Sequence, residues 1–241
     1  MLVLNTFGPA FGEPDGSSFC TKAMCFLTMS GVEWKANPGA DSRKAPFGKL
    51  PVLVDGDQTI ADSDSIRFHL EAKHGADFDA PLNAQQRAQS RACIRMAEEH
   101  LYHCLRYDRW KIDANWAHVR RRFFSYLPPL VRQIVPAMIR RHVLANLDGQ
   151  GLGKLSYEAM LARATLDLES IEVLLGNTPD EHPFLFGNTP VAADASVATV
   201  VAALAASPTQ TGLSDLVLGK PRLMRYIADA RAAIYPTGLA D

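Results

Sequence analysis

Strand-forming patterns are confined to the first third of this sequence, and helical patterns fill almost all of the other two thirds. The β-rich runs lie at 1–7, 32–34, 52–54 and 59–60. One helical pattern separates the first two runs and another comes after the last, which gives the order βαβ–ββα. Two parallel strands need such a crossover, so the order predicts a small mixed sheet with helices packed on it.

Two helices are expected within this first part. From 18 to 30, apolar residues recur at mixed spacings of three and four, and Gly31 ends the helix because glycine accepts a left-handed backbone. From 63 to about 74, Ile66 and Leu70 share one face. The sequence DGD between the last two strands supplies the turn of a hairpin.

Residues 76–83 form a linker, and after it the strand signals vanish. We therefore predict an α+β protein of two domains, with an α/β domain at 1–75 and an all-helical domain at 84–241. The helical patterns of the second domain lie at about 84–110, 112–126, 129–146, 157–175, 193–206 and 220–232.

The composition is that of an ordinary globular protein, with 47% apolar residues, 21% charged residues and a net charge of -1. No basic excess points to nucleic acid, and the N-terminal apolar run lacks the basic residues and the length of a secretory leader. The cysteines are irregularly spaced, so reduced thiols and a cytoplasmic location are expected. They are Cys20, Cys25, Cys93 and Cys104.

The most apolar long stretch is 123–139. Three prolines, Arg132 and Gln133 interrupt it, and a spanning helix needs about 20 mostly apolar residues, so no membrane span is expected. Arginines flank it at 120–122 and 140–141, which is also compatible with a position on a membrane surface. The favoured interpretation is a core or dimer-facing helix pair broken by prolines.

Ser17 and Cys20 stand three apart where a Gly/Pro/Asp-rich loop becomes a helix. A helix N-terminus carries free N–H groups and about +0.5 of an elementary charge, which lowers the pKa of a thiol placed there. Ser17 could also donate a hydrogen bond to a bound thiolate. The alternative is a common N-cap serine with a buried, inert cysteine after it.

Two further features precede the third strand and the second helix. Pro51 begins a strand and is a candidate for a cis peptide bond, which would expose the backbone of its neighbour to an extended ligand. Ser63 is expected to cap a helix whose N–H groups bind a carboxylate, while Asp62 takes an ammonium group. Together they suit an α-amino acid head group, although an acidic residue beside a helix cap is common.

Two side-chain pairs on one predicted helix have the residue types of metal ligands: His100 with Cys104, and Glu99 with His103. Each pair shares a helix face, but zinc prefers four ligands, so no metal is expected. Nearby, the sequence YDRW and Trp116 are interpreted as core packing around the stem of an arginine.

The order of these features resembles the cytosolic glutathione transferase superfamily over nearly the whole chain. The segments that carry the resemblance are SSFCTKAMCFLTMSGVEW, APFGKLPVLVDGDQTIADSDSIRFHLE, HPFLFGNTPVAADASVATVVAAL and KPRLMRYIADARAAIYP. Within the superfamily, the chain looks most like the branch of the failed axon connections protein and the metaxins. YDRW, Trp116, FFSYLPPLVR and GQGLGKLSYEAM carry that likeness. The resemblance implies a thioredoxin-like domain that binds glutathione and an all-helical domain that completes the site for a hydrophobic co-substrate.

The resemblance also implies roles for individual residues. Ser17 matches the residue that activates the glutathione thiol, and Cys20 the second reactive position. Lys49, Leu50 and Pro51 match the segment that meets the cysteinyl part of glutathione, with Pro51 in the cis form. Asp62 and Ser63 match the pair that holds the γ-glutamyl group.

In the helical domain, Asp194 matches an aspartate early in the core helix. The family usually has Thr or Ser three residues before it as an N-cap, and Val191 stands there instead. We expect the cap to come from Thr189 or Asn188, or to be missing. Tyr102 and Arg106 lie on the helix that borders the co-substrate cleft and are candidates to touch that ligand.

The resemblance implies a cytoplasmic, homodimeric transferase that conjugates glutathione to a small hydrophobic electrophile, as in detoxification. Two alternatives stay open. Cys20 could perform thiol–disulfide exchange with glutathione. The protein could also be a non-catalytic, metaxin-like binding or scaffold protein that keeps the fold.

Overall fold

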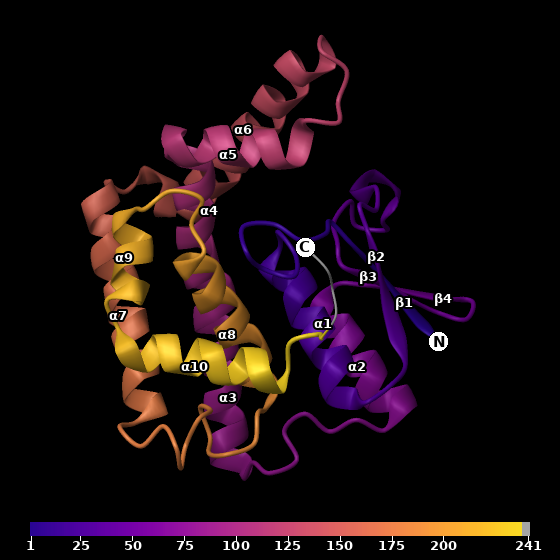
Figure 1. Cartoon of the computed structure of the whole chain (residues 1–241), viewed down its shortest axis with the longest axis vertical. Coiled ribbons are helices and arrows are strands. Elements are labelled where there is room, and N and C mark those ends of the chain that lie inside the picture. Colours follow the sequence, from indigo (N-terminus) through magenta and orange to yellow (C-terminus); the bar gives the residue numbers. More distant parts are fainter. Residues whose placement is uncertain (238–241) are drawn as a thin grey trace.

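A four-stranded sheet in the order β2-β1-β3-β4 forms the first part of the chain in the computed structural model, which describes residues 1–237 (Figure 1). β1 and β2 are parallel, and the other neighbours are antiparallel, as the βαβ–ββα order predicted. The strands are β1 Leu2–Thr6, β2 Trp34–Pro38, β3 Val52–Asp55 and β4 Gln58–Ala61. The second strand was predicted at 32–34 but lies at 34–38, where Trp34 and Ala36 are half-buried and the other three residues are exposed.

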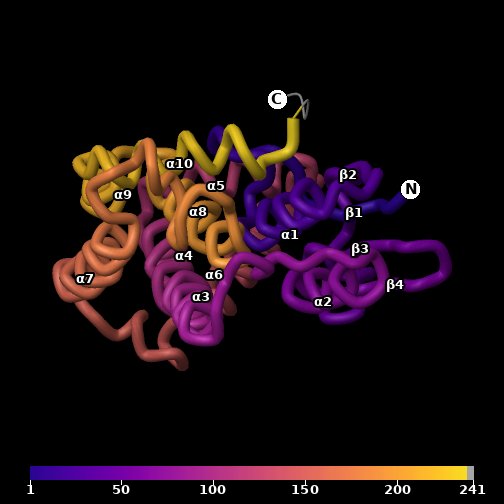
Figure 2. The backbone as a smooth tube through the Cα atoms, turned by 90° about the horizontal axis from the view of Figure 1, so that it is seen from below, coloured from indigo at the N-terminus to yellow at the C-terminus, as the bar shows by residue number. Residues whose placement is uncertain are grey.

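Helices α1 (Ser18–Ser30) and α2 (Ser63–His74) lie side by side against this sheet (Figure 2). Their bounds are those predicted. Gly31 and Gly75 end them at φ 68° and 71°, in the left-handed region where glycine is favoured. A 3-10 turn η1 (Ser42–Lys44) precedes β3.

The rest of the described chain is helical, so the predicted thioredoxin-like sheet with helices after it is confirmed (Figure 1). The predicted helix 84–110 is interrupted by a π-helical segment, and a short helix was missed because its seven residues show no pattern. The elements are α3 Ala84–Met96, η2 Ala97–Leu101, α4 Tyr102–Lys111, α5 Asp113–Phe124, α6 Val131–Gln150, η3 Leu152–Lys154, α7 Tyr157–Leu175, α8 Ala192–Ala205, α9 Gly212–Leu218 and α10 Pro221–Ala233.

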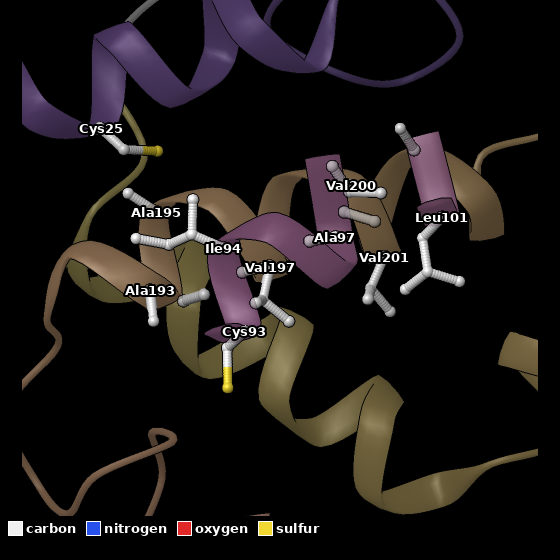
Figure 3. Packing of buried hydrophobic residues seen from close by; sticks show 14 of the residues in the cluster. Cys25, Cys93, Ile94, Ala97, Leu101, Ala193, Ala195, Val197, Val200 and Val201 are labelled. Carbon is white, nitrogen blue, oxygen red and sulfur yellow. The ribbon is translucent and has the colours of Figure 1, made fainter. Parts of the chain in front are cut away.

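Helix α8 is the centre of the core and is buried from Ala192 to Leu204. Its alanines let α1 and α3 approach closely, so that Ala195 lies near Ile94 of α3 and below Cys25 of α1 (Figure 3). Interiors are packed as densely as organic crystals, so these small side chains fix the distance between the two parts of the molecule.

A buried ion cluster joins the same two parts. The Lys22 ammonium, on α1, contacts the carboxylates of Asp64 on α2 and of Glu98 in η2, the latter at 2.6 Å. Arg95 reaches both carboxylates, at 3.0 and 2.6 Å, and the Ser196 hydroxyl donates to Glu98 at 2.7 Å. Removing one partner of such a pair strands a buried charge, so the cluster fixes the start of α2 against the helices.

The start of α8 lacks a side-chain cap, which was one of the expected alternatives. The Val191 N–H donates to Asp194 at 2.8 Å, and the Thr189 hydroxyl bonds to its neighbour instead. Asp194 also accepts the Leu185 N–H at 3.1 Å and the Tyr226 hydroxyl at 2.8 Å. This one carboxylate therefore joins a loop, the first turn of α8 and α10.

Helices α5 and α6 and the turn between them form a hairpin that stands out from the helical part at its upper end (Figure 1). Of the interpretation of 123–139 as a core or dimer-facing helix pair, the core part was wrong for much of the stretch, because Leu130, Ile134 and Met138 are 79%, 62% and 64% exposed. The dimer-facing part stays a prediction. Within residues 1–237, no helix combines the length and the apolar character needed to cross a bilayer.

Candidate functional site

A small apolar cluster gathers the predicted site residues at one edge of the sheet. It joins Cys20 in the first turn of α1, Leu50 and Val52 around the start of β3, and Ala61 at the end of β4. The residues next to these, which include Pro51 and Asp62, are thereby drawn together, and the Asp62 N–H reaches the Pro51 carbonyl at 3.4 Å.

Ser17 occupies the N-cap position of α1, but its hydroxyl makes no cap hydrogen bond. Its N–H donates to Asp15 at 2.8 Å, and the second oxygen of Asp15 accepts the Gly8 N–H at 2.6 Å. Asp15 thus folds the loop 8–16 back on itself and sets the position of Ser17. Burial raises the pKa of Asp15 to about 6, although the two N–H groups act to lower it. Sequence reasoning missed this role, for which an aspartate in a glycine-rich loop is the only signal.

Cys20 differs from what its place at a helix start suggested. Its side chain is completely buried, and burial, together with the nearby Asp15 carboxylate, raises the pKa of the thiol well above its usual value. The direction is opposite to the one that the helix dipole alone would give, because the thiol has lost its contact with solvent. The burial of Cys20 agrees with the alternative of a buried cysteine, and its chemical role stays a prediction.

The segment before β3 carries three predicted glutathione residues. The Leu50–Pro51 peptide bond is cis, as predicted. The side chain of Leu50 is buried in the apolar cluster with Cys20, while Lys49 is exposed beside it. Because Leu50 packs against Cys20, the backbone of this segment runs along the edge at which Ser17 lies.

At the start of α2, the N-cap residue is not the one that was predicted. Asp62, not Ser63, is the N-cap, and its Oδ1 accepts the N–H groups of Asp64 and Ser65 at 2.9 and 3.1 Å. Asp62 has φ 82°, a left-handed value that strains a residue with a side chain and that is often found at functional sites. Ser63 is buried as the first helical residue, and no partner for its N–H or hydroxyl occurs in the part of the chain described.

The helical part supplies the opposite wall. The ring of Tyr102 packs edge-on against Phe19 of α1, with ring centroids 4.7 Å apart, and the Arg106 guanidinium lies 6.0 Å above the Tyr102 ring. Since Phe19 lies between Ser17 and Cys20 in sequence, both predicted co-substrate residues lie beside the first turn of α1.

Arg109 is a further charged group at this wall, and sequence reasoning assigned it only to core packing. It is 6% exposed, and among residues 1–237 no carboxylate lies within ion-pair distance of it. Its Nη1 donates to the Gly16 carbonyl at 2.9 Å, and the guanidinium lies 4.9 Å from the centre of the Phe11 ring. Burial lowers its pKa to about 10. Arg109 thus holds the loop that leads into Ser17.

Within residues 1–237, neither candidate pair belongs to a group of three or more side chains that could hold a metal ion. His100 bonds to Asp167 at 2.5 Å, and Cys104 is buried in the core. A different group, Asp55 with His69 and His74, has its ligand atoms within 4.8 Å of one another. The Lys73 ammonium lies 2.9 Å from the same Asp55 oxygen, so this carboxylate already joins a network of hydrogen bonds.

The family model of glutathione S-transferase N-terminal domains matches residues 18–116. The isoprene-epoxide–glutathione S-transferase of Rhodococcus sp. (strain AD45) is 32% identical over 96% of this chain and 98% of its own length. The chain belongs to the glutathione S-transferase family. Metaxin-3 of Xenopus laevis is 25% identical over 82% of the chain and 64% of itself. The failed axon connections protein of Drosophila melanogaster is 26% identical over 79% of the chain and 47% of itself.

Solved structures of glutathione transferases share the fold of this family member. GSTFuA3 of Phanerochaete chrysosporium superposes with a TM-score of 0.65 at 18% identity, covering 98% of both chains. CsGST63524 of Ceriporiopsis subvermispora, solved in complex with glutathione, gives 0.63 at 14% identity over 98% and 99% of the two chains.

Proposed function

We propose that this protein is a transferase that conjugates glutathione to a small hydrophobic electrophile, with Ser17 activating the glutathione thiol. The observation that carries the proposal is the hydroxyl of Ser17, which stands at the N-terminus of α1 and is not used as a helix cap. A bound thiol at this place would receive a hydrogen bond from the hydroxyl and feel the positive end of the helix dipole. Lowering its pKa by about two units requires about 2.7 kcal/mol, which is reasonable for both effects together.

The γ-glutamyl end of glutathione would bind at the start of α2. The Ser63 N–H and hydroxyl are the donors proposed for its carboxylate. Asp62 uses Oδ1 to cap α2, so Oδ2 is the oxygen proposed to accept its ammonium group. The backbone beside Pro51, with Leu50 and Lys49, would pair with the cysteinyl part.

The electrophile would lie between the first turn of α1 and the helical wall of Tyr102, Arg106 and Arg109. In the step proposed, the thiolate sulfur forms a bond to an electrophilic carbon. If the electrophile is an epoxide, as the name of the Rhodococcus relative indicates for that protein, a ring C–O bond breaks and the oxygen takes up a proton. A homodimer in the cytoplasm and a detoxifying role belong to this proposal.

Two observations bear on the alternatives. The burial of Cys20 and the raised pKa of its thiol argue against exchange chemistry at that residue. The similarity to metaxin-3 keeps a non-catalytic binding protein as the competing hypothesis.

The test is glutathione binding by calorimetry, with a spectroscopic titration of the bound thiol, on wild type, Ser17→Ala and Cys20→Ser. A matched control is Ser30→Ala, at the opposite end of α1. We expect wild type and Cys20→Ser to bind with a lowered thiol pKa, and Ser17→Ala to bind while the thiol pKa rises by about one unit or more. Conjugation should then fall by about ten- to a hundred-fold in Ser17→Ala alone. Failure of the wild type to bind glutathione would leave the binding-protein hypothesis.

A further inference from the structure

The hairpin of α5, α6 and their turn concentrates positive charge. Between residues 114 and 147 the sequence has six arginines and no aspartate or glutamate, although the whole chain carries -1. The remaining residues therefore carry -7 in sum. The arginines are Arg120, Arg121, Arg122, Arg132, Arg140 and Arg141.

Five of these six arginines have no carboxylate partner within residues 1–237. Among residues 1–237, only Arg140 of this group has a carboxylate partner, Asp113 at 2.6 Å. Arg120 donates to the carbonyl of Arg132 at 3.2 Å, and Arg122 donates to the carbonyl of Pro9. Carbonyl contacts fix the guanidinium groups but leave their charge available to a partner.

The same hairpin exposes an apolar stripe. Leu130, Ile134 and Met138 succeed one another at intervals of four and are 79%, 62% and 64% exposed. Tyr126, in the turn before α6, is 80% exposed. The opposite side of α6 packs inward through residues such as Leu147. The stripe therefore faces solvent on an element that stands out from the body of the molecule (Figure 1).

The apolar stripe and the arginines together indicate which kind of surface this hairpin would bind. An apolar helical stripe of about two turns, with arginines that lack a carboxylate partner at both ends, fits a phospholipid surface, which has anionic head groups above an apolar interior. A groove of about 510 Å³ between α5 and α6 is lined by Arg120, Arg140 and Arg141, by one carboxylate, Asp148, and by Trp116 and Gln133 among others. A guanidinium group can donate two parallel hydrogen bonds to a phosphate, and the arginines outnumber the single acidic residue, so this groove suits a phosphate head group.

A second copy of the chain fits this face poorly. A two-fold interface centred on the hairpin would place the hairpin against itself, because such contacts are self-complementary. Six arginines would meet six arginines there, against only two acidic residues in each hairpin, Asp113 and Asp148.

We propose that the α5–α6 hairpin docks the protein peripherally on an anionic phospholipid membrane. The stripe of Leu130, Ile134 and Met138 enters the head-group region, and the arginines contact lipid phosphates. This goes beyond the transferase proposal and does not depend on it.

The experiment is co-sedimentation of the full chain with phosphatidylcholine vesicles that contain or lack phosphatidylserine. We expect binding only with phosphatidylserine, and a decrease as salt is raised. Ile134→Glu with Met138→Glu should weaken binding about tenfold or more, and Arg121→Gln with Arg141→Gln should remove much of the preference for anionic vesicles. The matched control is Leu166→Glu with Val173→Glu, which changes two exposed apolar residues of α7 (64% and 80% exposed) and should leave binding unchanged.

Sedimentation velocity on the same proteins separates the competing outcome, and circular dichroism verifies that each variant is folded. A wild type that ignores both kinds of vesicle would overturn the proposal. If, in addition, the Ile134→Glu, Met138→Glu variant alone becomes monomeric, the stripe is an interface between copies. Equal binding of the α6 and α7 variants to anionic vesicles would also overturn it, because the contact would then lie elsewhere.

Discussion

Two buried aspartates, one in each part of the molecule, perform the same local task with different consequences. Asp15 accepts the N–H groups of Gly8 and Ser17, and Asp194 accepts those of Val191 and Leu185. Burial raises the pKa of both carboxyl groups to about 6. Neither has a basic residue within ion-pair distance among residues 1–237, so uncharged donors hold each carboxylate.

The difference between them lies in their surroundings. Asp194 is completely buried within α8 and also receives the Tyr226 hydroxyl at 2.8 Å. Asp15 stands in a loop outside any helix, two residues before Ser17. Burying a carboxylate costs free energy, so the groups that each aspartate holds in place indicate its role. Asp194 holds elements of the fold together, whereas Asp15 holds the residue that carries a candidate catalytic hydroxyl.

The largest effect is expected from Asp194→Ala, because it strands two buried N–H groups and a buried hydroxyl. Each stranded group costs about 1–3 kcal/mol, so the free energy of unfolding should fall by about 4 kcal/mol. Urea denaturation measures this change. Thr189→Ala is the control, since Thr189 is exposed and does not cap α8, and it should change stability by less than about 0.5 kcal/mol. Similar losses in both variants would contradict this role of Asp194.

The next effect is the dependence of stability on pH. In the folded state the pKa of Asp194 is about 6, above the unfolded value of 3.8, so the folded protein holds this proton to higher pH. The contribution of the protonated group is fully present below about pH 4 and is lost as the pH rises through about 6. The stability of wild type relative to Asp194→Asn should therefore fall by about 2.4 kcal/mol between about pH 4 and 7. A flat difference over that range would refute the raised pKa.

Much of the fold could be predicted from local patterns, whereas the roles of these aspartates could not. Helices 18–30 and 63–74 were predicted with their ends because Gly31 and Gly75 mark them. The cis form of Pro51 came from the resemblance to the family, and the base rate of such bonds alone would not have supported it. In the edge strand β2, Trp34 and Ala36 alternate with exposed Lys35 and Asn37, but this pattern is short and the strand was placed too early, at 32–34.

The site depends on contacts between residues far apart in sequence, which no local pattern encodes. Arg109 reaches Gly16 across 93 residues, and Lys22 reaches Glu98 across 76. The two interpretations of the Cys20 thiol stayed open for the same reason, because its position at a helix start is visible in the sequence but its complete burial is not. The division into domains at 1–75 and 84–241 stays a prediction.

A smaller loss of stability, about 2 kcal/mol, is expected for Asp15→Ala, which strands only two N–H groups and lies at the edge of the core. Its larger consequence should be functional. Without Asp15 the Ser17 N–H loses its anchor, so conjugation should fall about tenfold or more while glutathione binding at Asp62 and Ser63 persists. Steady-state kinetics with calorimetry test this, with Asp194→Ala, assayed where it is folded, as the comparison. If both variants lose activity only in proportion to their folded fraction, the two aspartates do not differ as proposed.

The smallest effect on stability is expected from Asp15→Asn. This variant removes the charge of the side chain but keeps its size and one acceptor oxygen. The amide keeps one acceptor oxygen and removes the buried charge, so the free energy of unfolding at neutral pH should change by less than about 1 kcal/mol. The thiol pKa of bound glutathione should fall slightly, because a negative charge near Ser17 raises the pKa of any neighbouring thiol, as it does for Cys20. A spectroscopic titration of bound glutathione in wild type and Asp15→Asn measures this shift. A higher thiol pKa in the variant would mean that Asp15 acts through the orientation of Ser17 and that its charge has no net effect at the site.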